Sequence, residues 1–216
     1  MARQNSINKK SDSLTLDPGA SGDSFLQFDI NTTGEFRVGV DDTDDSFRIS
    51  QGSALGTNDT FVMTDAGERT MPLQPAFFAK VSGSDLSDVT GDNTAYSIIF
   101  DSERFDQGSD YATGTGIFTA PITGRYLFVS LVSMASITGS HTKGSVTMAT
   151  SNGGYYLING SPANMADYLG TLRISGATFS DMDAADTAFV SVRIFNGTKV
   201  VDISKNDTIF SGCLIC

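Results

Sequence analysis

Residues 126–134, YLFVSLVSM, constrain the fold of this chain more than any other stretch. A turn at 123–124 precedes them, and Pro121 ends a shorter apolar run, because proline has no N–H for a strand ladder. Side chains alternate across a strand, so one face carries Tyr126, Phe128, Ser130, Val132 and Met134, and the other carries Leu127, Val129, Leu131 and Ser133. Apolar groups on both faces require cover on both sides. One face can pack in a sandwich core, and a neighbouring subunit is the simplest cover for the other, which predicts an interface at Leu127, Val129 and Leu131.

The composition favours a β-rich chain that does not bind nucleic acid. Among 216 residues there are 22 glycines, and the acids comprise 22 Asp but only 3 Glu, at a net charge of −11. Asp and Gly favour turns whereas Glu favours helices, so we expect many short strands joined by turns. Binding to DNA or RNA phosphates needs clustered Lys and Arg, which this acidic chain does not offer.

The sequence contains no recognisable targeting or membrane segment. Residues 1–10, MARQNSINKK, include basic side chains, but the apolar segment of a secretory signal does not follow them. No stretch approaches the roughly 18 apolar residues of a membrane span. We therefore expect synthesis in a cytoplasm without a signal peptide, and no membrane insertion.

Residues 14–72 show short β patterns with too few apolar side chains to close a core alone. Residues 25–30 and 36–40 alternate around a turn at 31–34, and further strands are expected at 47–49 and 60–64. A lone hairpin is marginal in water, but three copies around a threefold axis could bury one apolar stripe together. We therefore predict a short intertwined trimeric β stalk. Its predicted interface residues are Leu26, Phe28, Phe36 and Val38.

The rest of the chain, residues 73–216, resembles a known family. The segment TGTGIFTAPITGRYLFVSLV at 113–132 is similar to the signature of the globular head of the first complement component's q subunit, a relative of the tumour necrosis factor jelly roll. Segments 75–79, 99–101 and 210–215 also resemble that family, in the same order. The resemblance implies an all-β, ten-stranded jelly-roll sandwich that assembles as a homotrimer, with a closing strand at 208–215 beside the central strand. Within this part we also expect strands at 95–100 and 168–174, an acidic turn at 180–186 and a hairpin turn at Asn196-Gly197.

The chain departs from the family pattern in two respects. Residues 106–110 read DQGSD at the place where the family often has Asn-Gly. The collagen-like stalk of the complement protein is also absent from the sequence. The immune ligands of that protein are therefore not carried over to this chain.

The N-terminal part of the chain resembles a different class of protein. Residues 21–50 and 55–77 are similar in composition and sequence to the shaft-to-head segments of bacteriophage fibre proteins. Residues 1–13 are polar and basic, and we predict that they form an attachment tip bound to another virion protein. These features imply a trimeric fibre or spike on the virion surface, whose head contacts a host glycan or protein. A trimer that only decorates a capsid or tail, and a non-viral, soluble, lectin-like binder, are the alternatives.

No residue pattern typical of an enzyme is present. The only histidine, His141, lies among small polar residues at 139–143 that provide no carboxylate to orient it, so we predict an exposed loop residue. A glycosidase needs two carboxyl groups, and four acids could supply them: Asp101, Glu103, Asp106 and Asp110. Acids in surface turns are the simpler explanation in so acidic a chain, so we predict a protein that is not an enzyme.

Calcium is the one cofactor for which the sequence offers candidates, because calcium prefers several oxygen ligands. The head candidates are Asp181, Asp183 and Asp186, and the stalk candidates are Asp41, Asp42, Asp44 and Asp45. Neither set has EF-hand spacing, and solvated turns are the alternative. Cys213 and Cys216 are three residues apart and would point to opposite sides of a strand, so we predict neither a disulfide nor a zinc site.

Loops at the end of a β-sandwich are the expected location of a binding surface. The candidate loops are 137–144, 151–154 and 161–167. The candidate ligand contacts in or beside them are His141, Tyr155, Tyr156 and Asn164. Tyr155 and Tyr156 could stack on a sugar or pack against a neighbour, and burial in the core is the alternative.

Overall fold

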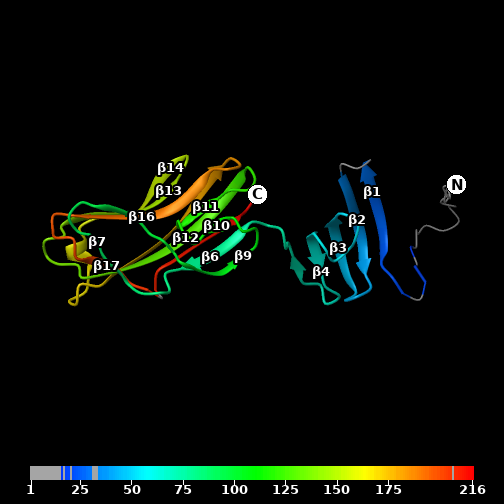
Figure 1. Ribbon diagram of the computed structural model, residues 1–216, viewed down its shortest axis with the longest axis horizontal. Helices are drawn as coiled ribbons and strands as arrows, with labels where there is room; N and C mark the ends of the chain where they lie inside the picture. Colours follow the sequence, from blue (N-terminus) through cyan, green and yellow to red (C-terminus); the bar gives the residue numbers. More distant parts are fainter. Residues whose placement is uncertain (1–15, 17, 20, 31–33, 206) are drawn as a thin grey trace. The chain divides into compact units, whose positions relative to one another are not determined.

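The structure is a computed structural model that describes residues 16, 18–19, 21–30, 34–205 and 207–216 (Figure 1). It divides into two compact units, Met1–Leu73 and Gln74–Cys216. The predicted attachment tip at 1–13 lies outside the described residues. Each unit is built of β-strands, so the predicted all-β class is confirmed.

The first unit is a single antiparallel sheet whose strands are neighbours in chain order (Figure 1). The strands are β1 (Ser24–Ile30), β2 (Gly34–Asp41), β3 (Ser46–Gln51), β4 (Asp59–Met63) and β5 (Arg69–Thr70). The acidic segment between β2 and β3 forms a turn, because Asp41 Oδ1 accepts the N–H of Thr43 and Asp44 Oδ1 accepts the N–H of Ser46. The four strands predicted in this part of the chain are confirmed.

This N-terminal sheet has two unlike faces, because directly paired residues point to the same side. One face is almost entirely apolar, and we call it the apolar stalk face. Its apolar side chains are Leu26, Phe28, Phe36, Val38, Val40, Phe47, Ile49, Phe61 and Met63, and the uncharged Ser24 and Gln51 lie at its edges. The opposite face carries the charges, and its paired positions include Asp29, Glu35, Arg37, Arg48 and Asp59. The described strand pairs all lie within one chain, so the intertwining of three copies stays a prediction.

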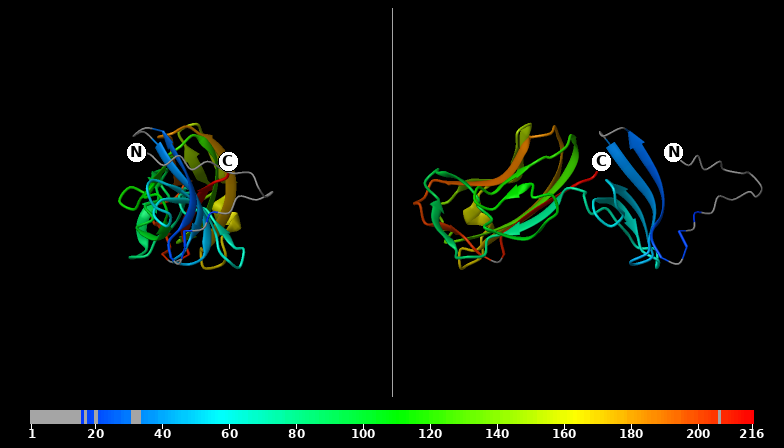
Figure 2. Two further views of the ribbon diagram at one scale, coloured as in Figure 1. Left: turned by 90° about the vertical axis from the view of Figure 1, so that its right-hand side faces the viewer. Right: turned by 45° about the vertical axis from the view of Figure 1, so that its right-hand side comes forward.

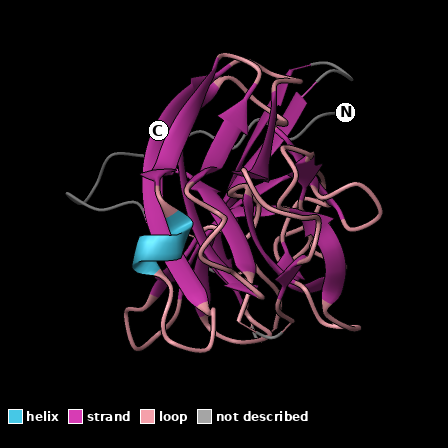
Figure 3. Ribbon diagram, turned by 90° about the vertical axis from the view of Figure 1, so that its left-hand side faces the viewer, coloured by secondary structure: helices cyan, strands magenta, loops and turns pink. Residues whose placement is uncertain are grey.

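The second unit is a sandwich of two sheets (Figures 2 and 3). The β13 sheet runs in the order β10 (Tyr111–Ala112), β11 (Ile117–Thr119), β16 (Thr187–Phe195), β13 (Lys143–Thr150), β14 (Gly153–Gly160), with β8 (Ala95–Ser97) beside β16. The β12 sheet runs in the order β7 (Leu86–Thr90), β17 (Val201–Ile203), β12 (Gly124–Ala135), β18 (Ile209–Leu214), β6 (Ala76–Lys80), β9 (Ser102–Asp106), with β15 (Leu172–Met182) beside β12.

Helix contributes almost nothing to this unit. A single four-residue helix, α1 (Pro162–Met165), is present among the described residues (Figure 3). No helix among the described residues is long and apolar enough to cross a membrane. The expected two-layer sandwich is therefore confirmed, although short strands such as β8 and β17 divide it more finely than the ten strands expected.

The core of the sandwich is built around aromatic rings. The even-numbered face of β12 is buried, including Tyr126 and Phe128. Phe77 in β6 stacks on Tyr111 and on Phe118, with ring centroids 4.9 Å apart in each pair. Gly212 in β18 is needed beside them, because a Cβ there would lie 2.6 Å from the Phe128 ring. The Phe-Ser-Gly sequence of β18 thus points two residues into the core. Phe210 fills it with a ring, and Gly212 leaves room for the ring of Phe128.

The long strand predicted at 126–134 is confirmed as β12, in the interior of its sheet. β12 pairs along its length with β15 on one side and with β18 on the other. Its neighbour β18 contains residues 209–214, so the predicted closing strand at 208–215 is confirmed beside it. Because β12 has a neighbouring strand on each side, its odd-numbered face lies in the middle of the sheet's outer surface.

The predicted bounds of two strands are wrong, because contacts with residues distant in the sequence determine where these strands begin and end. The strand expected at 168–174 is β15 instead, which begins at Leu172 and continues through residues 180–182, where the sequence suggested a turn. Pairing with all of β12 extends it. The strand expected at 95–100 ends at Ser97, because Ile98 and Phe100 turn into the core and are wholly buried.

The Asn196-Gly197 dipeptide does not form the predicted hairpin. Asn196 has φ +71°, as a turn requires, but the strand that follows, β17, pairs with β12 and β7 rather than with β16. The chain therefore crosses from one sheet to the other at this point. Gly197 allows the crossing, since a Cβ there would lie 2.3 Å from the ring of His141.

Candidate functional site

The outer surface of the β12 sheet carries a contiguous set of apolar side chains, which we call the apolar band. It consists of the odd-numbered residues of β12 and their paired neighbours in β15, β18, β6 and β9: Leu127, Val129, Leu131, Phe179, Ala177, Ile209, Phe78 and Phe105. Phe179 is 64% exposed and Val129 37% exposed. Leu127 and Leu131 are half-buried. The predicted head interface residues therefore lie together on the solvent side of the sheet.

The middle of the apolar band is hollowed. A shallow groove of about 200 Å³ lies over β6, β9, β12 and β18, and Phe78, Phe105 and Val129 contribute to its walls. Single exposed apolar side chains are ordinary on protein surfaces, but a contiguous patch marks an interaction site. The groove gives a large side chain from a partner a place to pack.

Ion pairs lie at the two ends of the β12–β15 pair. Arg125 Nε is 3.0 Å from Asp181 Oδ1, and Arg173 Nη2 is 3.1 Å from Asp207 Oδ2. All four side chains are exposed, so each pair contributes at most about 1 kcal/mol of stability. An apolar centre with a polar rim is the composition of many protein–protein interfaces.

The three head acids proposed for calcium have other partners. Asp181 pairs with Arg125. Asp186 Oδ2 accepts the N–H of Asp183 at 2.8 Å and the side-chain N–H of Asn152 at 2.7 Å. Within the part of the chain that the structure describes, these acids do not gather their oxygens within 4.8 Å of one another. The structure therefore explains Asp183 and Asp186 as part of the turn between β15 and β16, and Asp181 as a residue of β15 that pairs with Arg125.

The acids of the N-terminal unit surround an arginine. Arg48 Nε is 3.2 Å from Asp41 Oδ2, and its two other nitrogens bind Asp44 and Asp59. A hydrogen bond from the Ser46 hydroxyl, with help from Arg48, lowers the pKa of Asp44. Arg48 thus supplies the positive charge that these carboxylates require.

Two of the predicted calcium ligands of this unit do lie close to a third acid. Asp41 and Asp42 place carboxylate oxygens within 4.8 Å of one from Asp23, whereas Asp44 and Asp45 lie outside that group. Asp41 is already bound to Arg48, and Asp42 Oδ2 accepts the N–H of Gly22 at 2.7 Å. These contacts account for the cluster as part of the turn.

His141 is wholly buried, so the prediction of an exposed loop residue is wrong. Its Nδ1 is 2.9 Å from the N–H of Thr138, which can only donate, so Nδ1 is the acceptor. Nε2 then carries the proton and donates to the carbonyl of Thr198 at 3.2 Å. The ring joins two loops of the sandwich and cannot contact a ligand, and its partners lie too far along the sequence for spacing to reveal them.

The other three predicted ligand contacts are exposed. Tyr155 and Tyr156 lie on β14, the edge strand of the β13 sheet, and Tyr156 is the more exposed of the two. Asn164 lies in α1 and is also exposed. The structure does not bring them together with His141 in one site, and the alternative of core burial for the tyrosines is wrong.

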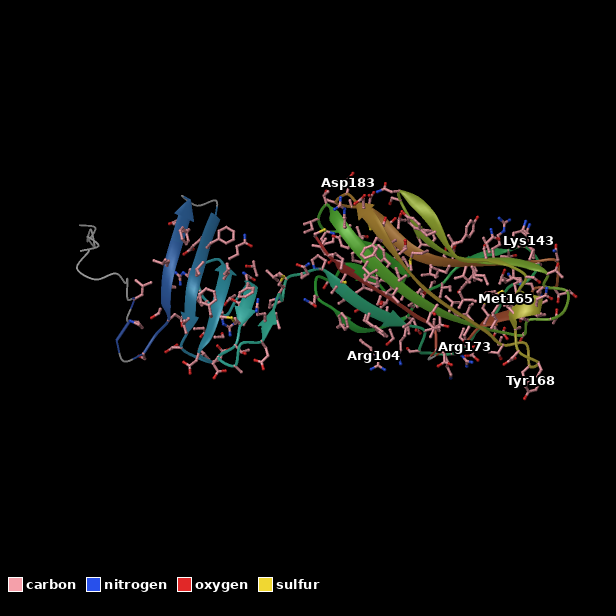
Figure 4. All side chains as sticks on the ribbon, turned by 180° about the vertical axis from the view of Figure 1, so that it is seen from behind. Arg104, Lys143, Met165, Tyr168, Arg173 and Asp183 are labelled. Atoms are coloured by element: carbon pink, nitrogen blue, oxygen red, sulfur yellow. The ribbon has the colours of Figure 1, made fainter. Side chains whose placement is uncertain are left out.

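A surface missed by the sequence analysis lies just after α1. Tyr168 is 94% exposed, and Leu169 and Met165 beside it are also exposed. Figure 4 shows Tyr168 projecting from the head at the end opposite to Asp183. Asp167 and Gly170 flank Tyr168 and Leu169, and Asp and Gly in this arrangement indicate a turn. The large side chains at 168 and 169 suggested the start of a strand instead.

This turn is held rigidly from behind. Asp167 Oδ1 accepts the N–H groups of Leu169 at 2.9 Å and Thr171 at 2.8 Å. The carbonyl of Gly170 accepts the N–H of Ile137 at 3.0 Å. Gly170 has φ +77°, and a Cβ would lie 2.5 Å from the Ile137 carbonyl oxygen, so only glycine fits. Two large apolar side chains are thus presented on a fixed support.

Two of the four acids considered for catalysis, Asp101 and Asp106, hold loops in place. Asp106 accepts the N–H groups of Asp110 at 3.1 Å and Tyr111 at 2.9 Å, and Asp101 accepts that of Ser82 at 2.7 Å. Burial, and then the charge of Asp106, raise the pKa of Asp110. Glu103 is exposed on β9. Cys213 and Cys216 are both free thiols.

A known family matches the second unit. The family model described as "C1q domain" matches residues 76–215. The structure is similar to the globular domain of the zebrafish complement 1qA protein, at 19% identity and a TM-score of 0.45, covering 66% of this chain and 98% of that one. It is also similar to murine APRIL, at 14% identity and a TM-score of 0.44, covering 66% and 99%.

A third similar structure is Eiger TNF from S. frugiperda, at 12% identity and a TM-score of 0.46, covering 66% of this chain and 93% of that one. No curated protein matches the sequence. The match of the family model to most of the chain carries the assignment.

Proposed function

Because the chain belongs to the C1q domain family, we propose that it forms a homotrimer that serves as a structural and adhesive fibre or spike of a virion. In this proposal the head, residues 73–216, contacts the host surface, and the N-terminal unit is the stalk that joins it to the particle. C1q and tumour necrosis factor-like domains form homotrimers and are generally binding modules rather than enzymes.

The apolar band is the observation that carries the proposal. A β-sandwich needs only its two inner faces covered, so Phe179 and Val129 contribute nothing to the core of one chain. Covering one Phe or Val side chain stabilises an assembly by about 1.5–3 kcal/mol. Several such side chains around one groove are sufficient to hold subunits together.

The N-terminal unit supports the assignment to a fibre. It is one sheet thick, whereas domains that are stable alone have at least two packed layers. Residues 21–50 and 55–77 also resemble the shaft-to-head segments of bacteriophage fibres. A thin sheet that precedes a trimeric head suits a stalk whose copies assemble together.

The exposed turn at 167–170 supports an adhesive role. Loops on a rigid scaffold are the usual place for binding residues, and Tyr is enriched where binding energy concentrates. A tyrosine ring alone suits either a sugar or an apolar protein pocket. Leu169 and Met165 beside it favour the protein pocket, because sugars need hydrogen-bonding side chains around the ring.

Light scattering on the full chain tests the trimer. We expect a mass of three protomers for the natural chain and of one protomer for Phe179→Asp, because the new charge would face an apolar partner. Tyr168→Asp is the matched control, since it replaces an exposed aromatic residue outside the apolar band, and it should remain a trimer. A folded natural chain that weighs one or two protomers contradicts the proposal.

Binding to cells of candidate host bacteria tests adhesion separately. We expect the fluorescently labelled full chain to bind one of them, and Tyr168→Ser with Leu169→Ser to reduce binding at least about tenfold while the trimer persists. Trimers that bind none of the candidate hosts would indicate a decoration protein without receptor contact.

A further inference from the structure

We propose that the apolar stalk face packs against the same face of two further copies of this chain, around a threefold axis. The partner is thus a second and third copy of the N-terminal sheet itself. The inference rests on the proposed function, because the trimeric head is what brings three sheets together. It adds a second assembly surface, in residues 24–63, that no family match covers.

The exposure of this face is the first observation. Phe28 is 57% exposed, Leu26 44% and Phe36 42%. Leu26 pairs with Val38, Val38 with Ile49, and Ile49 with Phe61. This row of paired apolar residues extends across the face from β1 to β4. A sheet of one layer has nothing of its own to cover such a face, and a sheet in water needs one face covered.

The distribution of charge is the second observation, and it favours an identical partner. All side chains named above for the apolar stalk face are uncharged, so two copies of it do not repel each other. The charged side chains of the opposite face form ion pairs with one another. Arg48 binds Asp41, Asp44 and Asp59, and Arg37 binds Glu35. The opposite face therefore satisfies its charges within the unit, where Asp41, Ser46, Ser50 and Asp59 are buried. The apolar face is the one left to pack against another apolar face.

Chain connectivity supplies the third argument. β5 ends at Thr70 and β6 begins at Ala76, so only residues 71–75 join the two units. Three sheets attached to one trimeric head reach an effective concentration of about millimolar or more. A contact too weak to associate free sheets is then sufficient, and closed threefold symmetry leaves no apolar face open to further copies.

Site-specific cross-linking tests this packing in the full chain. Phe28→Cys places a thiol on the apolar stalk face, and Gln27→Cys places one on the polar face of the same strand. Cys213→Ser and Cys216→Ser remove the natural thiols from both variants. A bis-maleimide with a spacer of about 10 Å matches the separation of packed sheets. We expect covalent dimers from Phe28→Cys, in a yield unchanged by tenfold dilution, and almost none from Gln27→Cys.

The outcomes separate this inference from the proposed function. Light scattering first establishes whether each variant is a trimer. A trimer that cross-links at neither position, or equally at both, overturns the threefold packing of the sheets and leaves the trimeric head standing. A chain that weighs one or two protomers overturns both. If Phe28→Cys fails to fold, Val40→Cys provides the same test, because Val40 is exposed on the same face.

Discussion

The two apolar surfaces of this chain differ in what lies behind them. The apolar band of the head covers a sheet whose other face is already packed against the β13 sheet, around Tyr126, Phe128 and Phe210. The apolar stalk face belongs to a sheet whose other face is charged and has no second layer in the described unit. The head therefore has a core within one chain, whereas on the packing proposed above the N-terminal sheet would depend on assembly for its apolar core.

This difference has a general lesson about apolar surfaces. The exposed fractions of Phe28 and Phe179 are similar, but their roles in stability are not. Replacing Phe179 removes association from a domain that still has a core. On the packing proposed above, replacing Phe28 removes the association that provides the core, so folding and binding would be one event there.

The largest expected effect is on the N-terminal sheet. Phe28→Asp would leave an uncompensated charge in each of three packed faces, at about 3–5 kcal/mol per buried charge. We expect amide hydrogen exchange between residues 24 and 63 to accelerate at least about 100-fold, with little change in the head. Gln27→Asp, on the polar face, is the control, and an equal acceleration in that variant would contradict the comparison.

The second effect distinguishes the two faces of one strand. Phe128→Ala should destabilise the head by about 3–5 kcal/mol, at any protein concentration, because it leaves a cavity in the core. Val129→Ala should instead lower the thermal midpoint only at concentrations where the trimer forms. Thermal unfolding across a dilution series measures both, and a concentration-independent loss in Val129→Ala would place that residue in the core.

The third effect concerns the buried histidine. His141→Ala leaves the N–H of Thr138 without its acceptor, at about 1–3 kcal/mol. We expect a lower thermal midpoint of the head and faster hydrogen exchange in residues 138–142 and 196–200. Ser140→Ala changes an exposed neighbour and should have little effect. An unchanged midpoint in His141→Ala would show that the ring does not hold the two loops.

The smallest effect depends on pH. The pKa of Asp110 is raised in the folded head, so the fold binds that proton more tightly than the unfolded chain does. Its ionisation therefore destabilises the head above the folded pKa and has no effect below the unfolded value. Asp110→Asn should raise the midpoint at pH 7 by no more than about 2–4 °C, and the gain should disappear on acidification toward pH 3. A gain that persists at pH 3 would assign the effect to something other than the charge.

Much of the fold could be predicted from the sequence because its signals are local. The alternation in 126–134 gave β12 and identified Leu127, Val129 and Leu131 as the face outside the core. The resemblance supplied the sandwich, which composition alone would not have specified. The strands of the N-terminal sheet followed from short alternating runs separated by Asp and Gly.

The failures share a long-range cause. The extent of β15 is determined by pairing with β12, and the burial of His141 depends on Thr198 and on glycines at 91 and 197. Neither relation is visible in sequence spacing. The turn at 167–170 was missed because the side chains of Tyr168 and Leu169 favour a strand, whereas the hydrogen bonds of Asp167 fix a turn.

That turn has an evolutionary consequence. Its shape is set by Asp167, Gly170 and the backbone of Ile137, so the side chains at 168 and 169 are free to change without any cost to folding. A trimer displays the turn three times, and avidity converts contacts of millimolar strength into durable attachment. For the adhesive role proposed above, a change of binding partner would therefore need substitutions only at residues 168 and 169, while the rest of the molecule stays as it is.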